Sequence, residues 1–239
     1  MKILSLECSA TPASAAITEN GKIIASAFVN VKLTHSQTLM PMAQNLLSAA
    51  ALDIDDIDGL AISNGPGSFT GIRIGISAVK GLAAPRNLPC VGVSTLLSMA
   101  YNVIDKDCIV CAVMDARCNQ VYNALFDIED GKITRICDDR ALMCEELAKD
   151  LKKLSQRENK CVIIVGDGSR VFSPYVSNME NVFEAPERNR LQNAVSVALA
   201  AEKLFEENKT VTADRLLPVY LRLPQAEREL KKKKEGLAE

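Results

Sequence analysis

Residues 108–139 read CIVCAVMDARCNQVYNALFDIEDGKITRICDD, and this stretch decides the fold. An apolar run covers 108–116, a run of alternating apolar and polar residues covers 120–128, and a third run follows the turn EDGK at 129–132. Short runs of this kind, separated by an Asp-Gly turn, are typical of consecutive antiparallel strands. The stretch therefore predicts three strands joined as hairpins.

The start of the chain shows the same order of elements. Strands are predicted over 2–9, 13–18 and 22–30, the last two joined by the similar turn ENGK. Both series then continue with a helix, a strand and a helix, predicted from the spacing of apolar residues. In the first half these elements cover about 38–52, 59–64 and 72–84, and in the second about 143–154, 161–168 and a stretch from about 169.

This repeated order predicts an α/β fold of two subdomains that face a cleft, each with a mixed sheet and flanking helices. The predicted subdomains are 1–103 and 104–222, followed by a charged tail over 223–239. An apolar helix over about 191–205 is predicted to pack back on the first subdomain. Because the halves share little sequence identity, an ordinary single α/β domain is the alternative.

Composition excludes several classes of protein. The 239 residues are 48% hydrophobic and 24% charged with a formal net charge of -2, so neither disorder nor a surface that attracts polyanions throughout is expected. The opening MKILSLECSATP is too short and too polar for a secretory segment or a membrane span. We expect a cytoplasmic protein without a membrane partner.

Cysteine and histidine give no metal or redox site. The eight cysteines are scattered, and the close pair Cys108 and Cys111 lies on a predicted strand, where residues three apart point to opposite faces. His35 is the only histidine, so neither a two-histidine metal site nor a serine triad with a GxSxG motif is available. The cysteines are predicted to be reduced core residues, and no catalytic or metal-binding residue is predicted.

A second group of residues could bind phosphate. Glu7 and Asp115 end predicted strands, where an acid can hold magnesium or water, and the glycine-rich loop over 64–75 precedes a helix whose amides favour an anion. The hairpin after Glu7 includes Pro12, which has no amide to donate, and the loop matches neither a P-loop nor a dinucleotide fingerprint. We therefore predict only a vestigial nucleotide or phosphate region, made of Glu7, Ser9, Gly67, Ser68, Thr70, Gly71 and Asp115.

The two helices of the first half indicate a partner. The first is apolar on two sides, with one stripe at Leu39, Met42 and Leu46 and another at Met40, Leu47 and Ala51. The second carries small residues that let another helix approach closely: Gly71, Gly75, Ser77, Ala78 and Gly81. Burial of both stripes within the chain is the alternative, and the sequence leaves open which stripe faces outward.

Several stretches together resemble the TsaB (YeaZ) family. They are Ser9 after a strand-end acid, THS at 34–36, GPGSFTGIRIG at 65–75, GVSTL at 92–96, DAR at 115–117 with Val121-Tyr122, and PVYLR at 218–222. The resemblance runs from Met1 to about Arg222 and leaves out only the tail. It differs at Glu7-Cys8-Ser9, where many members have Asp-Thr-Ser, and the longer acid suits a fixed magnesium geometry poorly.

This resemblance implies a duplicated actin-like (ASKHA, RNase H-like) fold and a non-catalytic subunit. Such a subunit activates the larger paralogue TsaD, which moves a threonylcarbamoyl unit onto an adenosine beside the tRNA anticodon, and the ATPase TsaE joins the complex in bacteria. The tRNA is then reached through the complex. The implied partner interface comprises His35, Leu39, Met42, Leu46, Arg73, Gly75, Ile76 and Lys80.

Two further expectations concern ligands and the oligomeric state. No cofactor is expected to bind tightly, and ATP or ADP with magnesium is expected only weakly or at the partner interface. A homodimer through the same helices is expected when the partner is missing. The alternative function is a free-standing actin-like ATPase or small-molecule kinase that uses Glu7, Asp115 and the glycine loop, while the lysine run at 231–234 is expected to be a solvated end rather than a tRNA contact.

Overall fold

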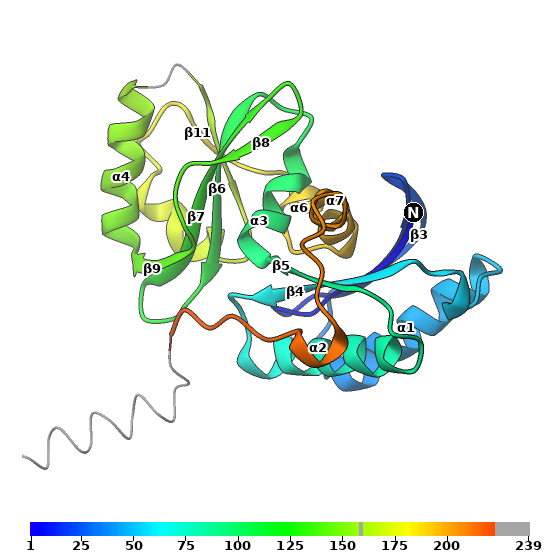
Figure 1. Ribbon diagram of the computed structural model, residues 1–239. Helices are drawn as coiled ribbons and strands as arrows, with labels where there is room; N and C mark the ends of the chain where they lie inside the picture. Colours follow the sequence, from blue (N-terminus) through cyan, green and yellow to red (C-terminus); the bar gives the residue numbers. More distant parts are fainter. Residues whose placement is uncertain (158–159, 223–239) are drawn as a thin grey trace, which may run out of the picture.

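The first half of the chain forms a five-stranded mixed sheet in the computed structural model, which describes residues 1–157 and 160–222 (Figure 1). The strand order is β3-β2-β1-β4-β5; the first three strands are antiparallel and the last two run parallel to β1. The strands are β1 (Lys2–Glu7), β2 (Ala13–Glu19), β3 (Lys22–Val29), β4 (Gly59–Gly65) and β5 (Cys90–Ser94).

The second half repeats this arrangement, with strand order β11-β10-β6-β7-β8 and β9 paired to β7. Again two antiparallel hairpins come first and parallel strands follow. The predicted duplicated α/β fold is confirmed, although β5, β9 and β11 were not predicted; β9 and β11 have only three or four residues, too few for a clear alternation. The strands are β6 (Cys108–Asp115), β7 (Gln120–Glu129), β8 (Lys132–Arg135), β9 (Arg140–Met143), β10 (Val162–Val165) and β11 (Val182–Glu184).

Helices cover both faces of each sheet. In the first subdomain α1 (His35–Ala49) and α2 (Phe69–Ala83) pack on one face, and α7 (Ala194–Glu206) packs on the other (Figure 1). In the second, α3 (Thr95–Ala100) covers one face and α4 (Cys144–Arg157) the other. The short elements are α5 (Ser169–Phe172), α6 (Glu187–Arg190) and five 3-10 turns: η1 (Ile54–Asp56), η2 (Ala84–Arg86), η3 (Tyr101–Val103), η4 (Ser173–Tyr175) and η5 (Ala213–Arg215).

Helix α7, from the C-terminal part of the chain, packs on the first two strands. Its Ala194 carbonyl accepts a hydrogen bond from Ser5 Oγ at 2.7 Å, and its Ala194 amide donates to Ser14 Oγ at 2.9 Å. Val197 and Ala201 lie in one apolar cluster with Ile3 of β1. The second face of the first sheet is therefore completed by residues almost 190 positions later in the chain.

The glycines of α2 divide into two sets. A Cβ at Gly75 would lie 2.5 Å from Cys8 Sγ and 2.7 Å from Ile62 Cδ1, and one at Gly71 would lie 2.2 Å from the Cys8 carbonyl oxygen. No heavy atom lies within 4 Å of a Cβ built on Gly81. Gly71 and Gly75 thus let α2 pack closely on β1 and β4, whereas Gly81 faces outward.

This packing corrects part of the predicted partner interface. Leu39, Met42 and Leu46 of α1 are buried in the core against the sheet. Gly75 and Ile76 lie on the buried side of α2. The expectation that these five residues face a partner is wrong, because one apolar stripe of each helix is needed to cover the sheet. The stripe of α1 that faces solvent contains Met40, which is 40% exposed.

Cys108 and Cys111 behave as the strand spacing predicts. The expectation that every cysteine is a core residue is wrong for Cys118, which is exposed, and for Cys137 and Cys161, which are half-buried. All eight are free, and Cys108 and Cys111 lie in different apolar clusters on opposite faces of the second sheet. Within the described residues there is no group of three or more His, Cys, Asp or Glu residues that could hold a metal ion. In the same part of the chain, no helix is long and apolar enough to cross a bilayer. The predicted tail over 223–239, with its lysine run, lies outside the described residues.

Candidate functional site

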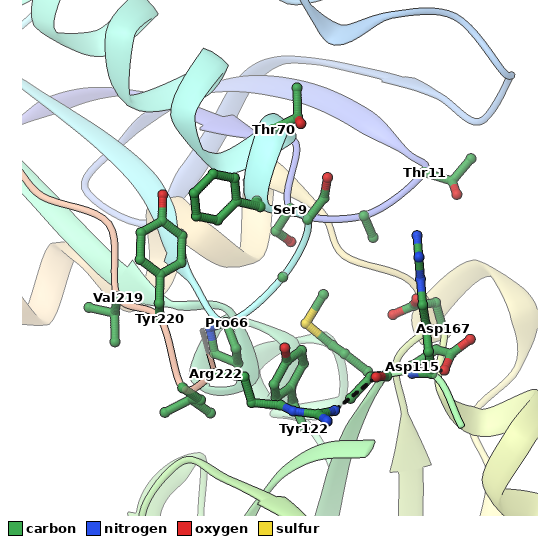
Figure 2. Close-up of a pocket in the computed structure, with 18 of the residues that line it drawn as sticks. Ser9, Thr11, Pro66, Thr70, Asp115, Tyr122, Asp167, Val219, Tyr220 and Arg222 are labelled. Atoms are coloured by element: carbon green, nitrogen blue, oxygen red, sulfur yellow. Dashed lines mark hydrogen bonds between the residues drawn. The ribbon is translucent and has the colours of Figure 1, made fainter. Parts of the chain in front are cut away.

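A cleft of about 580 Å³ lies between the subdomains, with residues from both halves in its walls (Figure 2). The first subdomain contributes the hairpin between β1 and β2, His35 and the glycine loop. The second contributes the hairpin between β6 and β7 and Asp167, which follows β10. Residues 219–222, near the end of the described chain, complete the wall. The cleft lies where the nucleotide region was predicted.

Glu7 is wholly buried at the end of β1 and is not one of the cleft-lining residues. Its Oε1 accepts a hydrogen bond from the Ser9 amide at 2.6 Å. Burial raises the pKa of the Glu7 carboxyl, as does the nearby Asp167, while the Ser63 and Ser9 hydroxyl groups oppose the shift. A buried carboxyl that favours its neutral form and lies behind the hairpin backbone is poorly suited to bind magnesium in the cleft.

The glycine loop packs directly on the first hairpin. The Ser68 amide donates to the Ser9 carbonyl at 2.6 Å, and a Cβ at Gly67 would lie 2.5 Å from the same oxygen. In the hairpin, the Ser9 amide is used by Glu7 and Pro12 has none. These two positions therefore offer phosphate no amide, so the first hairpin fits a phosphate cradle poorly.

In the second half, two acids lie near each other at the cleft (Figure 2). Asp115 is exposed and accepts from the Arg117 amide at 2.7 Å. Burial raises the pKa of Asp167, and the charge of Asp115 raises this pKa further. The side-chain amide of Gln192 donates to Asp167 Oδ1 at 2.6 Å and lowers the pKa. Asp167 was not singled out from the sequence, although a strand-end acid after the apolar run at 162–165 was a visible signal.

The predicted nucleotide region is thus partly assembled. Ser9, Gly67, Ser68, Thr70 and Asp115 line the cleft, and Glu7 and Gly71 lie behind it.

His35 also lines the cleft, at the start of α1. Its Nε2 lies 2.8 Å from the Ala10 carbonyl, so the ring links α1 to the first hairpin. Of the predicted partner residues, Arg73 is exposed and Lys80 is half-buried, with Nζ 3.1 Å from the Asp214 carbonyl.

A second surface, which shares Thr70 with the cleft, is formed by the outer sides of α1 and α2. The exposed residues of α2 recur at helical spacing and are small apart from one arginine: Thr70, Arg73, Ser77 and Gly81. Helix α1 exposes Met40, Gln44 and Ser48, and its Leu47 is half-buried against the core of the first subdomain. We call this set the docking face. A helix from another chain could approach it closely, because little side-chain volume stands in the way.

Changing Glu7 to Gln should raise stability at neutral pH. Because burial raises the pKa of Glu7 in the folded state, the folded protein keeps a proton that the unfolded chain has released, so the stability of the wild type falls as pH rises from the unfolded pKa through the folded one. The neutral variant lacks this loss. We expect a higher Tm by several degrees at pH 8 and little difference near pH 4, measured by thermal unfolding.

The control for that measurement is Glu180→Gln, which changes an exposed acid. Asp167 is present in both proteins, but because its charge raises the pKa of Glu7 the two acids are coupled, and the comparison reports on the pair. A Glu7→Gln variant that is less stable than the wild type at pH 8 would show that the ionised carboxylate stabilises the fold.

Comparison with known proteins assigns this architecture. The family described as TsaD, tRNA N6-adenosine threonylcarbamoyltransferase, matches residues 29–230. The "tRNA threonylcarbamoyladenosine biosynthesis protein TsaB" of Escherichia coli (strain K12) is 32% identical over 224 residues, which is 93% of this chain and 95% of that protein. The structure "YeaZ from Pseudomonas aeruginosa" superimposes with a TM-score of 0.78 at 27% identity, over 92% of this chain and 99% of that one.

A more distant structure shares the fold alone. The "Activator of the 2-Hydroxyisocaproyl-CoA Dehydratase from Clostridium difficile", solved with ADPNP, has a TM-score of 0.51 at 12% identity, over 87% of this chain and 97% of that one. The two sheets with their repeated strand order are a duplicated actin-like fold, as predicted. The chain belongs to the TsaB (YeaZ) family.

Proposed function

We propose that this chain takes part in making threonylcarbamoyladenosine on tRNA as a non-catalytic subunit that binds and activates a TsaD-type paralogue. The observation that carries this proposal is the docking face on α1 and α2, together with the likeness to TsaB proteins. The substrate tRNA is then handled by the complex, with a TsaE-type ATPase as a further partner. The chain itself supplies a surface rather than reacting groups.

The geometry of the docking face fits a helix pair from a partner. Each of the two helices buries one stripe against the sheet and leaves a second side exposed, so two helices of another chain could complete a four-helix arrangement. Thr70, Ser77 and Gly81 allow close approach, and Met40 supplies an adaptable apolar contact. Without that partner, the same face would pair with a second copy of this chain.

The cleft supports the non-catalytic part of the proposal. Glu7 is buried with a raised pKa, the Ser9 amide is bonded to it and Pro12 has no amide, so the features that a kinase or ATPase needs at this position are weak. ATP or ADP with magnesium would then bind only weakly, or at the interface with the partner. The free-standing kinase or ATPase is therefore the less favoured function.

A reconstitution tests the proposal. Unmodified tRNA is incubated with a TsaD-type protein, a TsaE-type ATPase and the threonylcarbamoyl-adenylate synthase, with and without this chain, and modified adenosine is measured by mass spectrometry. We expect product only in the complete mixture. Equal product without the chain would contradict the accessory role, and ATP turnover by the isolated chain that Glu7→Gln abolishes would favour the kinase.

A further inference from the structure

Residues 217–222 form a strap that is attached to the first subdomain by its backbone. The Val219 amide donates to the Asn64 carbonyl at 2.8 Å, and Asn64 Nδ2 donates to the Leu217 carbonyl at 3.2 Å. Gly65 makes this passage possible, since a Cβ there would lie 2.1 Å from the Val219 carbonyl oxygen and its φ is +136°. The end of β4 is thus shaped to receive the strap.

Side chains link the strap to the first turn of α2. The Tyr220 ring stacks on Phe69 with centroids 4.7 Å apart. Arg73 Nε donates to the Tyr220 hydroxyl at 2.8 Å, and its guanidinium lies 3.9 Å from the Phe69 centroid. Arg73 belongs to the docking face, so the strap holds one of that face's large side chains in place.

The other end of the strap reaches the second subdomain. Arg222 Nη1 donates to the Ala116 carbonyl at 3.0 Å, in the hairpin between β6 and β7 (Figure 2). Ala116 directly follows Asp115 in the cleft wall. A single residue, Leu221, therefore separates the contact of the strap with α2 from its contact with the opposite subdomain, and both contacts lie in the cleft wall.

We propose that the strap is a clamp that couples the arrangement of the two subdomains to the docking face. A partner that restrains the Arg73 side chain on α2 also restrains Tyr220. Because Tyr220 and Arg222 lie on the same short strap, the hydrogen bond from Arg222 to the second hairpin is stabilised as well. By reciprocity, loosening the second hairpin weakens docking. The clamp itself stands on the contacts above, whereas its effect on a partner rests on the proposed function.

The test begins with the isolated protein. Hydrogen exchange is followed in the wild type, in Tyr220→Ala and in Arg222→Ala, with Arg170→Ala as a control that removes an exposed arginine of the second subdomain. Tyr220→Ala removes the ring stacking and the hydrogen bond to α2, yet we expect amides of the β6–β7 hairpin to exchange about tenfold faster. Unchanged exchange in that hairpin for both strap variants would overturn the clamp.

The second measurement is affinity for a TsaD-type protein. Arg222→Ala lies away from the docking face, and we expect its Kd to rise about tenfold relative to the wild type and to Arg170→Ala. Faster hydrogen exchange in the hairpin with an unchanged Kd would show that the strap links the two subdomains. It would overturn the proposed coupling of the subdomains to the docking face. A wild type that does not bind the partner would contradict the proposed function, and the exchange data would then still decide for or against the clamp.

Discussion

Replacing Gly75 with alanine should lower the free energy of unfolding by about 3 kcal/mol, an overpacking effect at the upper end of the usual range. The new methyl carbon would lie 2.5 Å from Cys8 Sγ and 2.7 Å from Ile62 Cδ1, between α2 and two central strands. Neither neighbour can retreat easily, because both are buried in the core. Urea unfolding followed by circular dichroism measures the change.

The matched control is Gly81→Ala on the same helix. No heavy atom lies within 4 Å of the new methyl carbon, and alanine is the better helix former, so stability should rise by up to about 1 kcal/mol. The two substitutions are chemically identical and should differ in sign. A destabilisation of similar size at both sites would mean that helix α2 does not pack as described.

Replacing Ser77 with glutamate should abolish binding to a TsaD-type protein while the chain stays folded. Ser77 is exposed at the centre of the docking face, so the isolated chain can solvate the new carboxylate. In a complex that buries this face, the longer charged side chain would lose water and obstruct the partner helix, and Arg73, one turn earlier, is already bonded to Tyr220. We expect the Kd to rise at least about a hundredfold, which corresponds to roughly 2.7 kcal/mol, by calorimetric titration.

Two controls accompany this variant. Ser77→Ala keeps the small size and should bind like the wild type, and Ser177→Glu adds the same charge to an exposed site of the second subdomain. Thermal unfolding of all three should match the wild type within a degree or two. Normal binding by Ser77→Glu would place the partner elsewhere on the chain.

Much of the fold could be predicted because the hairpins carry strong local signals. The turns at 19–22 and 129–132 and the apolar runs around them locate β2, β3, β7 and β8 within a few residues. The short strands β9 and β11 have no such pattern and exist because neighbouring strands offer free edges. Pairing of this kind depends on the tertiary structure and leaves little trace in the sequence.

The docking face was predicted only in outline. The sequence shows two apolar sides on α1, and nothing in their spacing says that Leu39, Met42 and Leu46 cover the sheet while Met40 is exposed. The orientation of a glycine on a helix is harder still to predict, because glycine has no side chain whose polarity would show whether it faces the core or the solvent. Gly75 and Gly81 look equivalent in the sequence, and only the positions of β1 and β4 distinguish them.

The place of α7 sets the order of events during synthesis. The strands of the first sheet are complete by residue 94, yet the helix that covers one of their faces ends at residue 206. Ribosomes add about 5–20 residues per second. The apolar side chains of Ile3, Val91 and Val93 therefore stay without their contacts to α7 for several seconds after they are synthesised. During that interval the nascent first half exposes one apolar face of its sheet, a surface that is prone to aggregate.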